Sequence, residues 1–220
     1  LATAKMMEGP VLVHVDTTKG KGYCYAEENP GEYHGTSGFD IDTGKAFQAA
    51  GTNFSNEFGL YLTELGKQDK RICAITAAMK YGTGLNHFSH AFQQEGRFFD
   101  VGIAEPHAVT FAGGLAANGM IPVFAVYSSF LQRCYDEIIH DLSIEKQHVI
   151  IGIDRAGIVG NDGETHQGLF DVAMLSSVPG ITVYSPATYE ELRKTLYESI
   201  YHQTGVCCVR YPRGGEGKLP

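Results

Sequence analysis

Between residues 53 and 212, apolar side chains follow two alternating spacings, and these predict strands and helices in turn. Short continuous apolar runs, typical of strands buried on both faces, occur at residues 71–76, 99–104, 122–127, 148–154, 181–184 and 206–210. Stretches of helical character lie between them, at residues 54–65, 85–92, 105–116, 131–144, 169–177 and 188–202. This alternation predicts an α/β fold: a parallel β-sheet with helices on both faces.

Two of these predicted helices present a clear apolar face. The first begins after Asn53, and its apolar side chains are Phe54, Phe58, Tyr61, Leu62 and Leu65. The second spans residues 131–144 and is expected to turn Leu131, Cys134, Ile138 and Leu142 inward.

The first fifty residues follow a different pattern. Residues 2–7 resemble the tail of a helix, and the β-branched run at residues 10–15 predicts a buried strand. Glycines alternate with Lys19 and Lys21 directly afterwards, which suits either an anion-binding loop or an ordinary solvated turn. Residues 26–51 are polar and glycine-rich and are expected to form a connection without elements of its own.

Composition narrows the class of protein. The 220 residues carry a formal charge of −8, which argues against general binding to nucleic acid or an anionic membrane, since both need a basic face. Neither a bilayer-spanning run nor a leader pattern is present in the sequence, so we expect a soluble cytoplasmic protein. The five cysteines are odd in number and lack C-x-x-C spacing, which indicates reduced thiols.

Glu105 stands where an apolar run meets the start of a helix. Pro106 suits the first helical turn, because proline has no N–H to leave unpaired there. A parallel strand would deliver this carboxylate to the crevice where open α/β sheets bind ligands. The alternative is that Glu105 only complements the helix dipole from solvent.

Further polar and aromatic side chains follow the other predicted strands. Because the carboxyl ends of parallel strands share one edge, we expect these side chains to converge. A carboxylate pair, arginines, aromatic rings and a histidine at one edge predict a site for an anionic, phosphorylated substrate with an acid/base step. The set is Glu105, Tyr127, Phe130, Arg133, Arg155, Asp162, His166 and Arg213. His87 and His90 lack a third ligand at a recognisable spacing, so no metal site is predicted from them.

Five segments carry a family resemblance. They are FDVGIAE at residues 99–105, YSSFLQR at 127–133, DRAG at 154–157, DGETHQG at 162–168 and RYPRG at 210–214. Together they resemble the pyrimidine-binding domain of the 1-deoxy-D-xylulose-5-phosphate synthase family, transketolase-like enzymes that use thiamine diphosphate. KGKGY at residues 19–23 and YHG at 33–35 resemble the end of that family's preceding diphosphate-binding domain.

The resemblance implies which reaction the whole enzyme catalyses and how this chain divides into three parts. Pyruvate would lose CO2 on the cofactor, and the two-carbon fragment would join D-glyceraldehyde 3-phosphate. Residues 1–34 would end the diphosphate-binding domain, residues 35–52 would be a linker, and residues 53–220 would be the pyrimidine-binding domain. The sequence is then expected to be an inactive fragment of a homodimeric enzyme, without the carboxyl-terminal domain.

The resemblance also implies residue roles. Glu105 would hydrogen-bond the pyrimidine nitrogen, Phe130 would stack on that ring, and Lys19 would contact the cofactor. Tyr127, Arg133, Arg155 and Arg213 would surround the substrate phosphate, while Asp162, His166 and His34 would act near the reacting carbons. Pro106 stands where the family pattern has glutamine.

The Gly-Asp-Gly and Asn signature that binds Mg²⁺ in the superfamily does not occur in these 220 residues, so the magnesium ligands are expected outside them. Two other interpretations remain open. One is a transketolase or a keto-acid dehydrogenase β subunit, and the other is a non-catalytic half-subunit that binds or regulates a partner. The intact Glu105 argues against the last.

Overall fold

The computed structural model describes residues 1–36, 38–47 and 51–217. By its internal contacts the chain divides into two compact units, Leu1–Ala50 and Gly51–Pro220. The assignment of residues 1–34 to a preceding domain and of residues 35–52 to a linker stays a prediction.

The second unit is built on a parallel sheet, as the alternation of spacings predicts. Within residues 51–217 the strands have the order β2-β1-β3-β4-β6-β5, and every neighbouring pair is parallel. They are β1 (Ile72–Thr76), β2 (Phe98–Asp100), β3 (Ile121–Tyr127), β4 (Val149–Asp154), β5 (Ile181–Tyr184) and β6 (Val206–Arg210). Because β1, β3 and β4 lie inside the sheet and are covered on both faces, their residues are almost all buried.

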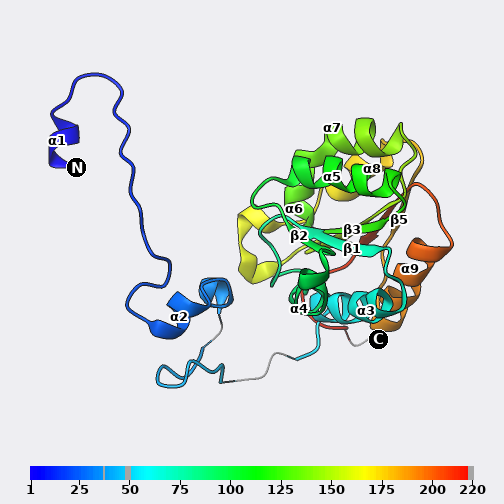
Figure 1. Ribbon diagram of the computed structural model, residues 1–220, viewed down its shortest axis with the longest axis horizontal. Helices are drawn as coiled ribbons and strands as arrows, with labels where there is room; N and C mark the ends of the chain where they lie inside the picture. The colour runs from blue at the N-terminus through cyan, green and yellow to red at the C-terminus, as the bar shows by residue number, and fades with distance from the viewer. Residues whose placement is uncertain (37, 48–50, 218–220) are drawn as a thin grey trace. The chain divides into compact units, whose positions relative to one another are not determined.

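Helices cover both faces of this sheet (Figure 1). One face carries α3 (Phe54–Gln68), α4 (Asn86–Phe92) and α9 (Tyr189–Tyr201). The other carries α5 (Glu105–Ala117), α6 (Ser128–Leu131), α7 (Tyr135–Glu137) and α8 (Asp171–Ser176). The predicted fold class is confirmed.

Local sequence explains where α3 begins. The Asn53 side chain accepts a hydrogen bond from the backbone N–H of Asn56, which satisfies one of the free donors of the first turn. Phe58, Leu62 and Leu65 are buried against the sheet, as their spacing predicts. The same helix exposes Leu60 on its other side.

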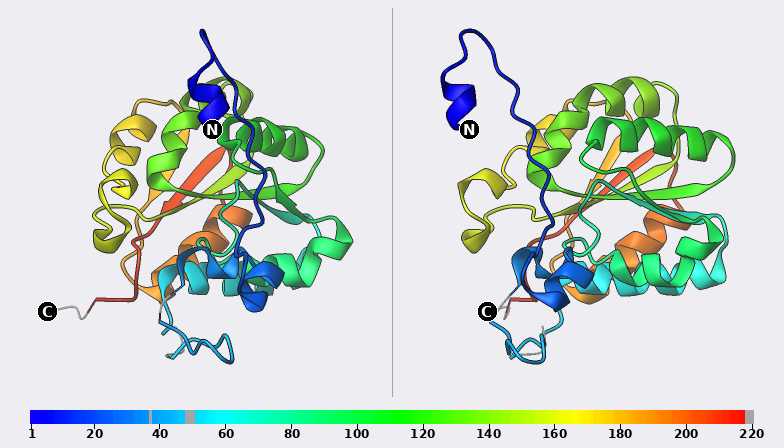
Figure 2. Two further views of the ribbon diagram at one scale, coloured as in Figure 1. Left: turned by 90° about the vertical axis from the view of Figure 1, so that its left-hand side faces the viewer. Right: turned by 60° about the vertical axis from the view of Figure 1, so that its left-hand side comes forward.

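The register of the central strands places their carboxyl ends level. Tyr127 at the end of β3 is paired with Asp154 at the end of β4, and Ile153 is paired with Arg210 at the end of β6. Side chains that follow β3, β4 and β6 therefore start from one row. The segment coloured yellow, which contains short 3-10 turns at Gly160–Asp162 and Glu164–His166, lies at this end of the sheet beside α6 (Figure 2).

Two predicted elements of this unit differ from the structure. The strand expected at residues 99–104 is β2, which ends at Asp100 and lies at the sheet edge, where one side has no neighbour to extend the ladder. The helix expected at residues 131–144 is instead α6, a 3-10 turn at Gln132–Cys134, α7 and a π-helix at Ile138–Ser143. The segment therefore contains one turn that is tighter than an α-helix, the 3-10 turn, and one stretch that is wider, the π-helix. The predicted inward residues Leu131, Cys134, Ile138 and Leu142 are nevertheless completely buried.

In the first unit the structure confirms the helix expected within residues 2–7, has further helices where the polar composition predicts none, and forms no strand at residues 10–15. Within its described residues it has α1 (Ala2–Lys5), α2 (Cys24–Glu28) and a 3-10 helix at Glu32–Gly35. Residues 10–15 form no strand, because no described segment pairs with them, and Leu12 remains 95% exposed. The predicted buried strand at residues 10–15 is therefore wrong. The prediction of a connection without elements at residues 26–51 is wrong over residues 26–28 and 32–35, while residues 37 and 48–50 lie outside the described residues.

None of the helices in the described residues is both long enough and apolar enough to cross a membrane.

Candidate functional site

Glu105 is the first residue of α5, and its carboxylate is buried. The side chain is 3% exposed, and Oε1 lies 2.6 Å from Nη1 of Arg133. Pro106 follows in the first turn, as predicted. A carboxylate held inside the protein at a helix start, with a cation as its partner, is more than a solvated complement to the helix dipole.

Arg133 connects Glu105 to a group of rings. Its guanidinium carbon lies 4.9 Å from the centroid of Phe130, in cation–π geometry. Phe130 is in turn stacked with Tyr127 at 5.8 Å and an interplanar angle of 19°. The His166 ring stands edge-on to Phe130 at 5.3 Å and lies 6.1 Å from Tyr127. The loop after β4 and the segment after β3 thus meet over Phe130.

Two arginines and a carboxylate extend the cluster beyond Tyr127. The Arg155 guanidinium carbon lies 4.1 Å from the centroid of the Tyr127 ring. Oδ2 of Asp162 lies 3.1 Å from Nε of Arg213 and 3.5 Å from Nε of Arg155. The carboxylate therefore joins arginines that follow two different strands, β4 and β6.

The structure thus brings together all eight residues that the sequence predicts at the carboxyl edge of the sheet. Contacts run without a gap from Glu105 through Arg133, Phe130, Tyr127 and Arg155 to Asp162, with His166 and Arg213 attached. Lys19 and His34 lie in the first unit, where their side chains are exposed. Their participation in this site stays a prediction.

Burial affects the ionisation of Tyr127. Desolvation raises the pKa of its phenol, and the cation of Arg155 opposes that rise. The ring therefore stays a neutral phenol near neutral pH. It can donate one hydrogen bond and present an aromatic face to Arg155.

Sequence reasoning missed three groups that hold Arg155. The buried carboxylate of Asp154 accepts hydrogen bonds from both the backbone N–H and the side chain of Arg155. The Gly82 carbonyl and the Ser55 hydroxyl accept from the same guanidinium nitrogen. Asp154 could have been recognised in the sequence as an acidic residue at the end of an apolar strand. A main-chain carbonyl, such as that of Gly82, has no sequence signature.

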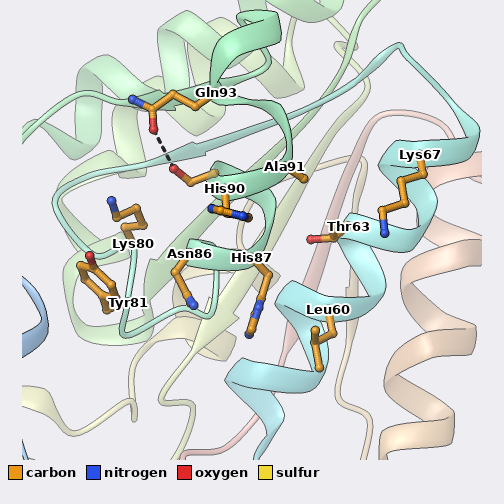
Figure 3. Close-up of a pocket in the computed structure, with 11 residues that line it drawn as sticks. Leu60, Thr63, Lys67, Lys80, Tyr81, Asn86, His87, His90, Ala91 and Gln93 are labelled. Carbon is orange, nitrogen blue, oxygen red and sulfur yellow. Dashed lines mark hydrogen bonds between the residues drawn. The ribbon is translucent and has the colours of Figure 1, made fainter. Parts of the chain in front are cut away.

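A separate pocket of about 570 Å³ lies between α3 and α4 (Figure 3). Its lining includes Lys67, Lys80, His87 and His90, and none of the eight clustered residues. Nε2 of His87 lies 2.7 Å from Oδ1 of Asn56, so the fold already uses this ring nitrogen. Within the described residues, no group of three or more His, Cys, Asp or Glu side chains could hold a metal ion.

The site and fold define a class, and comparison with known proteins identifies it. Residues 51–215 match the family model described as "Transketolase, pyrimidine binding domain". The chain belongs to the transketolase pyrimidine-binding domain family. The match begins at the contact boundary between the two units.

Curated relatives carry a more particular name. The chain is 52% identical over 215 residues to a protein of Clostridium acetobutylicum named 1-deoxy-D-xylulose-5-phosphate synthase, covering 98% of this chain and 34% of that protein. It is 50% identical to the protein of the same name from Caldanaerobacter subterraneus, covering 99% and 35%. The chain thus spans about a third of the length of these relatives. The resemblance to this family is confirmed.

Solved structures agree on the fold. A protein titled "Split gene transketolase, inactive beta4 tetramer" superposes with a TM-score of 0.67 at 27% identity, covering 77% of this chain and 54% of that one. Transketolase from Leishmania mexicana also superposes with a TM-score of 0.67, at 20% identity, covering 77% of this chain and 27% of that one.

Proposed function

We propose that this chain is the pyrimidine-binding part of a 1-deoxy-D-xylulose-5-phosphate synthase. The whole enzyme would condense pyruvate with D-glyceraldehyde 3-phosphate, release CO2 and form 1-deoxy-D-xylulose 5-phosphate. Relatives of that name match nearly the whole chain at 50–52% identity, whereas the split-gene transketolase matches at 27%. The observation that carries the proposal is the buried Glu105 carboxylate paired with Arg133, whose guanidinium in turn lies over the Phe130 ring.

Thiamine diphosphate is the proposed cofactor, and when bound it would supply a ring that accepts electrons from the former carbonyl carbon of the substrate, so that this carbon can act as a nucleophile. The residues present fit its aminopyrimidine. Glu105 has a buried carboxylate that can share a proton with a ring nitrogen, and low solvent access strengthens that hydrogen bond. Phe130 is half-buried and offers a flat apolar face to a flat ring.

The arginine-rich end of the site would hold the phosphorylated aldehyde. Arg155 and Arg213 provide two guanidinium groups, and such planar forks suit phosphate oxygens. Tyr127 lies against Arg155 and can donate its phenol hydrogen. Asp162 is paired with both arginines, and His166 stands edge-on to Phe130; these two side chains would hold or move a proton near the reacting carbons. Arg133 would add positive charge beside them.

Other parts of the proposal rest on the family resemblance. Lys19 and His34 would complete the site from the diphosphate-binding side. Mg²⁺ would accompany the diphosphate, with its ligands outside these 220 residues. A homodimer in the cytoplasm is the proposed assembly and location.

The test uses the intact protein that contains this chain, supplied with thiamine diphosphate and Mg²⁺. Release of ¹³CO2 from [1-¹³C]pyruvate is measured with and without D-glyceraldehyde 3-phosphate. We expect rapid release that depends on the aldehyde, together with 1-deoxy-D-xylulose 5-phosphate as product. Two-carbon transfer from a ketose phosphate without gas release would instead make the protein a transketolase and overturn the proposal.

A further inference from the structure

Asp154 is a buried carboxylate that has no role in the proposed reaction as described above. It is the last residue of β4 and is completely buried. Its Oδ1 accepts a hydrogen bond from the backbone N–H of Arg155 at 2.7 Å and another from Nη1 of Arg155 at 2.8 Å. One oxygen thus binds both the main chain and the side chain of the next residue.

The same guanidinium nitrogen is surrounded by acceptors from three parts of the fold. Nη1 of Arg155 also donates to the carbonyl of Gly82, in the loop after β1, and lies 3.2 Å from Oγ of Ser55 in α3. A guanidinium Nη carries two hydrogens, so these acceptors, with Asp154, use all of its donor capacity. This end of Arg155 is therefore committed to the protein interior.

The other edge of the guanidinium makes no hydrogen bond within the protein. Across residues 1–36, 38–47 and 51–217, neither Nε nor Nη2 of Arg155 has a hydrogen-bond acceptor; Nε is buried, and Oδ2 of Asp162 covers it as an ion-pair partner at 3.5 Å, the position that a phosphate oxygen would take. The N–H groups of Nε and Nη2 point in the same direction, a geometry that matches two oxygens of a phosphate. Tyr127, whose ring centroid lies 4.1 Å from the guanidinium carbon, supports the plane from one face.

The backbone of Arg155 needs an anchor of this kind. Its φ is +58°, a left-handed conformation that costs a residue with a side chain free energy unless the surroundings fix it. The hydrogen bond from its N–H to Asp154 stabilises that turn. Burial raises the pKa of Asp154, and the adjacent guanidinium opposes this rise, so the pair is best described as one buried unit.

We propose that Asp154 is a positioning residue: its carboxylate holds the Nη1 end of Arg155 so that Nε and Nη2 together face the phosphate of the substrate. This assignment rests on the proposed function for the identity of the phosphorylated aldehyde. Asp154 touches neither substrate nor cofactor and acts only through Arg155.

The test compares a phosphorylated with an unphosphorylated acceptor in the intact protein. Asp154→Asn removes the charge and keeps the size. We expect its KM for D-glyceraldehyde 3-phosphate to rise on the order of tenfold, with a much smaller change in kcat. The kcat/KM for D-glyceraldehyde, which lacks the phosphate, should remain that of the wild type.

Asp171→Asn is the matched control. Asp171 is also a buried carboxylate and is paired with Arg210, with Oδ2 2.9 Å from Nε, outside the cluster. Asp171→Asn should lower the melting temperature as Asp154→Asn does. The ratio of kcat/KM for D-glyceraldehyde 3-phosphate to kcat/KM for D-glyceraldehyde should stay that of the wild type. Equal losses for both acceptors in Asp154→Asn, or the same change of ratio in Asp171→Asn, would mean a merely structural role and would overturn the assignment.

If Asp154→Asn does not fold, a variant in which both Asp154 and Arg155 are replaced by uncharged residues still tests the proposal. Arg155→Met and the double variant Asp154→Asn/Arg155→Met should have the same KM for D-glyceraldehyde 3-phosphate, because Asp154 has no effect without Arg155. A further rise in the double variant contradicts the proposal.

Binding of inorganic phosphate separates this inference from the proposed function. If the wild type does not convert pyruvate and the aldehyde, the proposed function fails, yet phosphate should still bind more weakly to Asp154→Asn than to Asp171→Asn. Equal phosphate binding by the two variants, or none by the wild type, would overturn the role of Asp154.

Discussion

Arg133 and Glu105 form a 2.6 Å ion pair in which the carboxylate is 3% exposed and the guanidinium is 52% exposed. The guanidinium therefore already contacts solvent, whereas the carboxylate is buried. A ligand that hydrogen-bonds Glu105 would take the place of Arg133 as its partner and displace the guanidinium toward solvent. Until then, the pair stabilises the buried carboxylate.

Glu105→Gln tests the proton-sharing role directly. Glutamine keeps the shape and can still accept a hydrogen bond from Arg133, but it cannot exchange a proton with a ring nitrogen. We expect CO2 release from pyruvate to fall by roughly 10²- to 10⁴-fold, the usual contribution of a positioned acid or base. The melting temperature, followed by circular dichroism, should change little.

Glu57→Gln is the control for this experiment, because Glu57 is another buried carboxylate paired with an arginine, Arg193, on the opposite face of the sheet. Its loss should affect stability and leave turnover intact. Full activity in Glu105→Gln would contradict the mechanism.

Phe130→Leu tests the aromatic contact with the cofactor. Leucine preserves apolar volume but loses the flat face, and aromatic stacking contributes about 0.5–1.5 kcal/mol beyond area burial. We expect the Kd of thiamine diphosphate, measured by fluorescence quenching, to rise by roughly two- to tenfold. Phe99→Leu, which disrupts an edge-to-face contact with Phe111, should leave this Kd unchanged. Equal changes in both variants would count against stacking by Phe130.

The sequence pattern located β5 and β6 well because local signals bound both strands. The limits of β5 and β6 agree with prediction, since Gly180 and Gly205, with φ of +76° and +71°, stand directly before the two apolar runs. The pattern failed for β2 and for residues 10–15. An apolar run shows that a segment could be buried, but strand length depends on neighbours that are distant in sequence.

The candidate site was predictable to the extent that it follows from topology. Parallel strands place Glu105, Arg155 and Arg213 at one edge regardless of loop detail. The hydrogen bonds that hold these side chains in position were not predictable from the sequence. Contacts such as that between Arg155 and the Gly82 carbonyl join residues from separate loops through the main chain, which has no side-chain signature.

Buried cysteines should be unreactive in the folded protein. Desolvation and, to a smaller extent, the nearby carboxylate of Glu105 raise the pKa of Cys134 to about 12. At pH 8 that leaves roughly one thiolate in ten thousand. We expect mass spectrometry after brief iodoacetamide treatment to show alkylation of the exposed Cys24 and none of Cys134. Both should be alkylated in guanidinium chloride. Equally rapid labelling of both in the native state would show that the core around Cys134 opens.

Gly59 should be essential for packing α3 against the loop before α4. A methyl group at this position would overlap the carbonyl oxygen of Gly84, which is backbone and cannot rotate away. Gly59→Ala should therefore destabilise the protein by about 1–3 kcal/mol, the cost of overpacking, despite the better helix propensity of alanine. The midpoint of urea unfolding measures this change.

Gly114→Ala is the matched control, because Gly114 also lies inside a helix, α5, but an added Cβ would meet no atom within 4 Å. Alanine there should stabilise the protein by about 0.5–1 kcal/mol through backbone entropy. The two substitutions are chemically identical, so opposite shifts of the midpoint isolate the close approach of Gly59 to Gly84. A stabilising shift for Gly59→Ala would mean that α3 can move away from the loop, and that the two are less tightly packed than their geometry indicates.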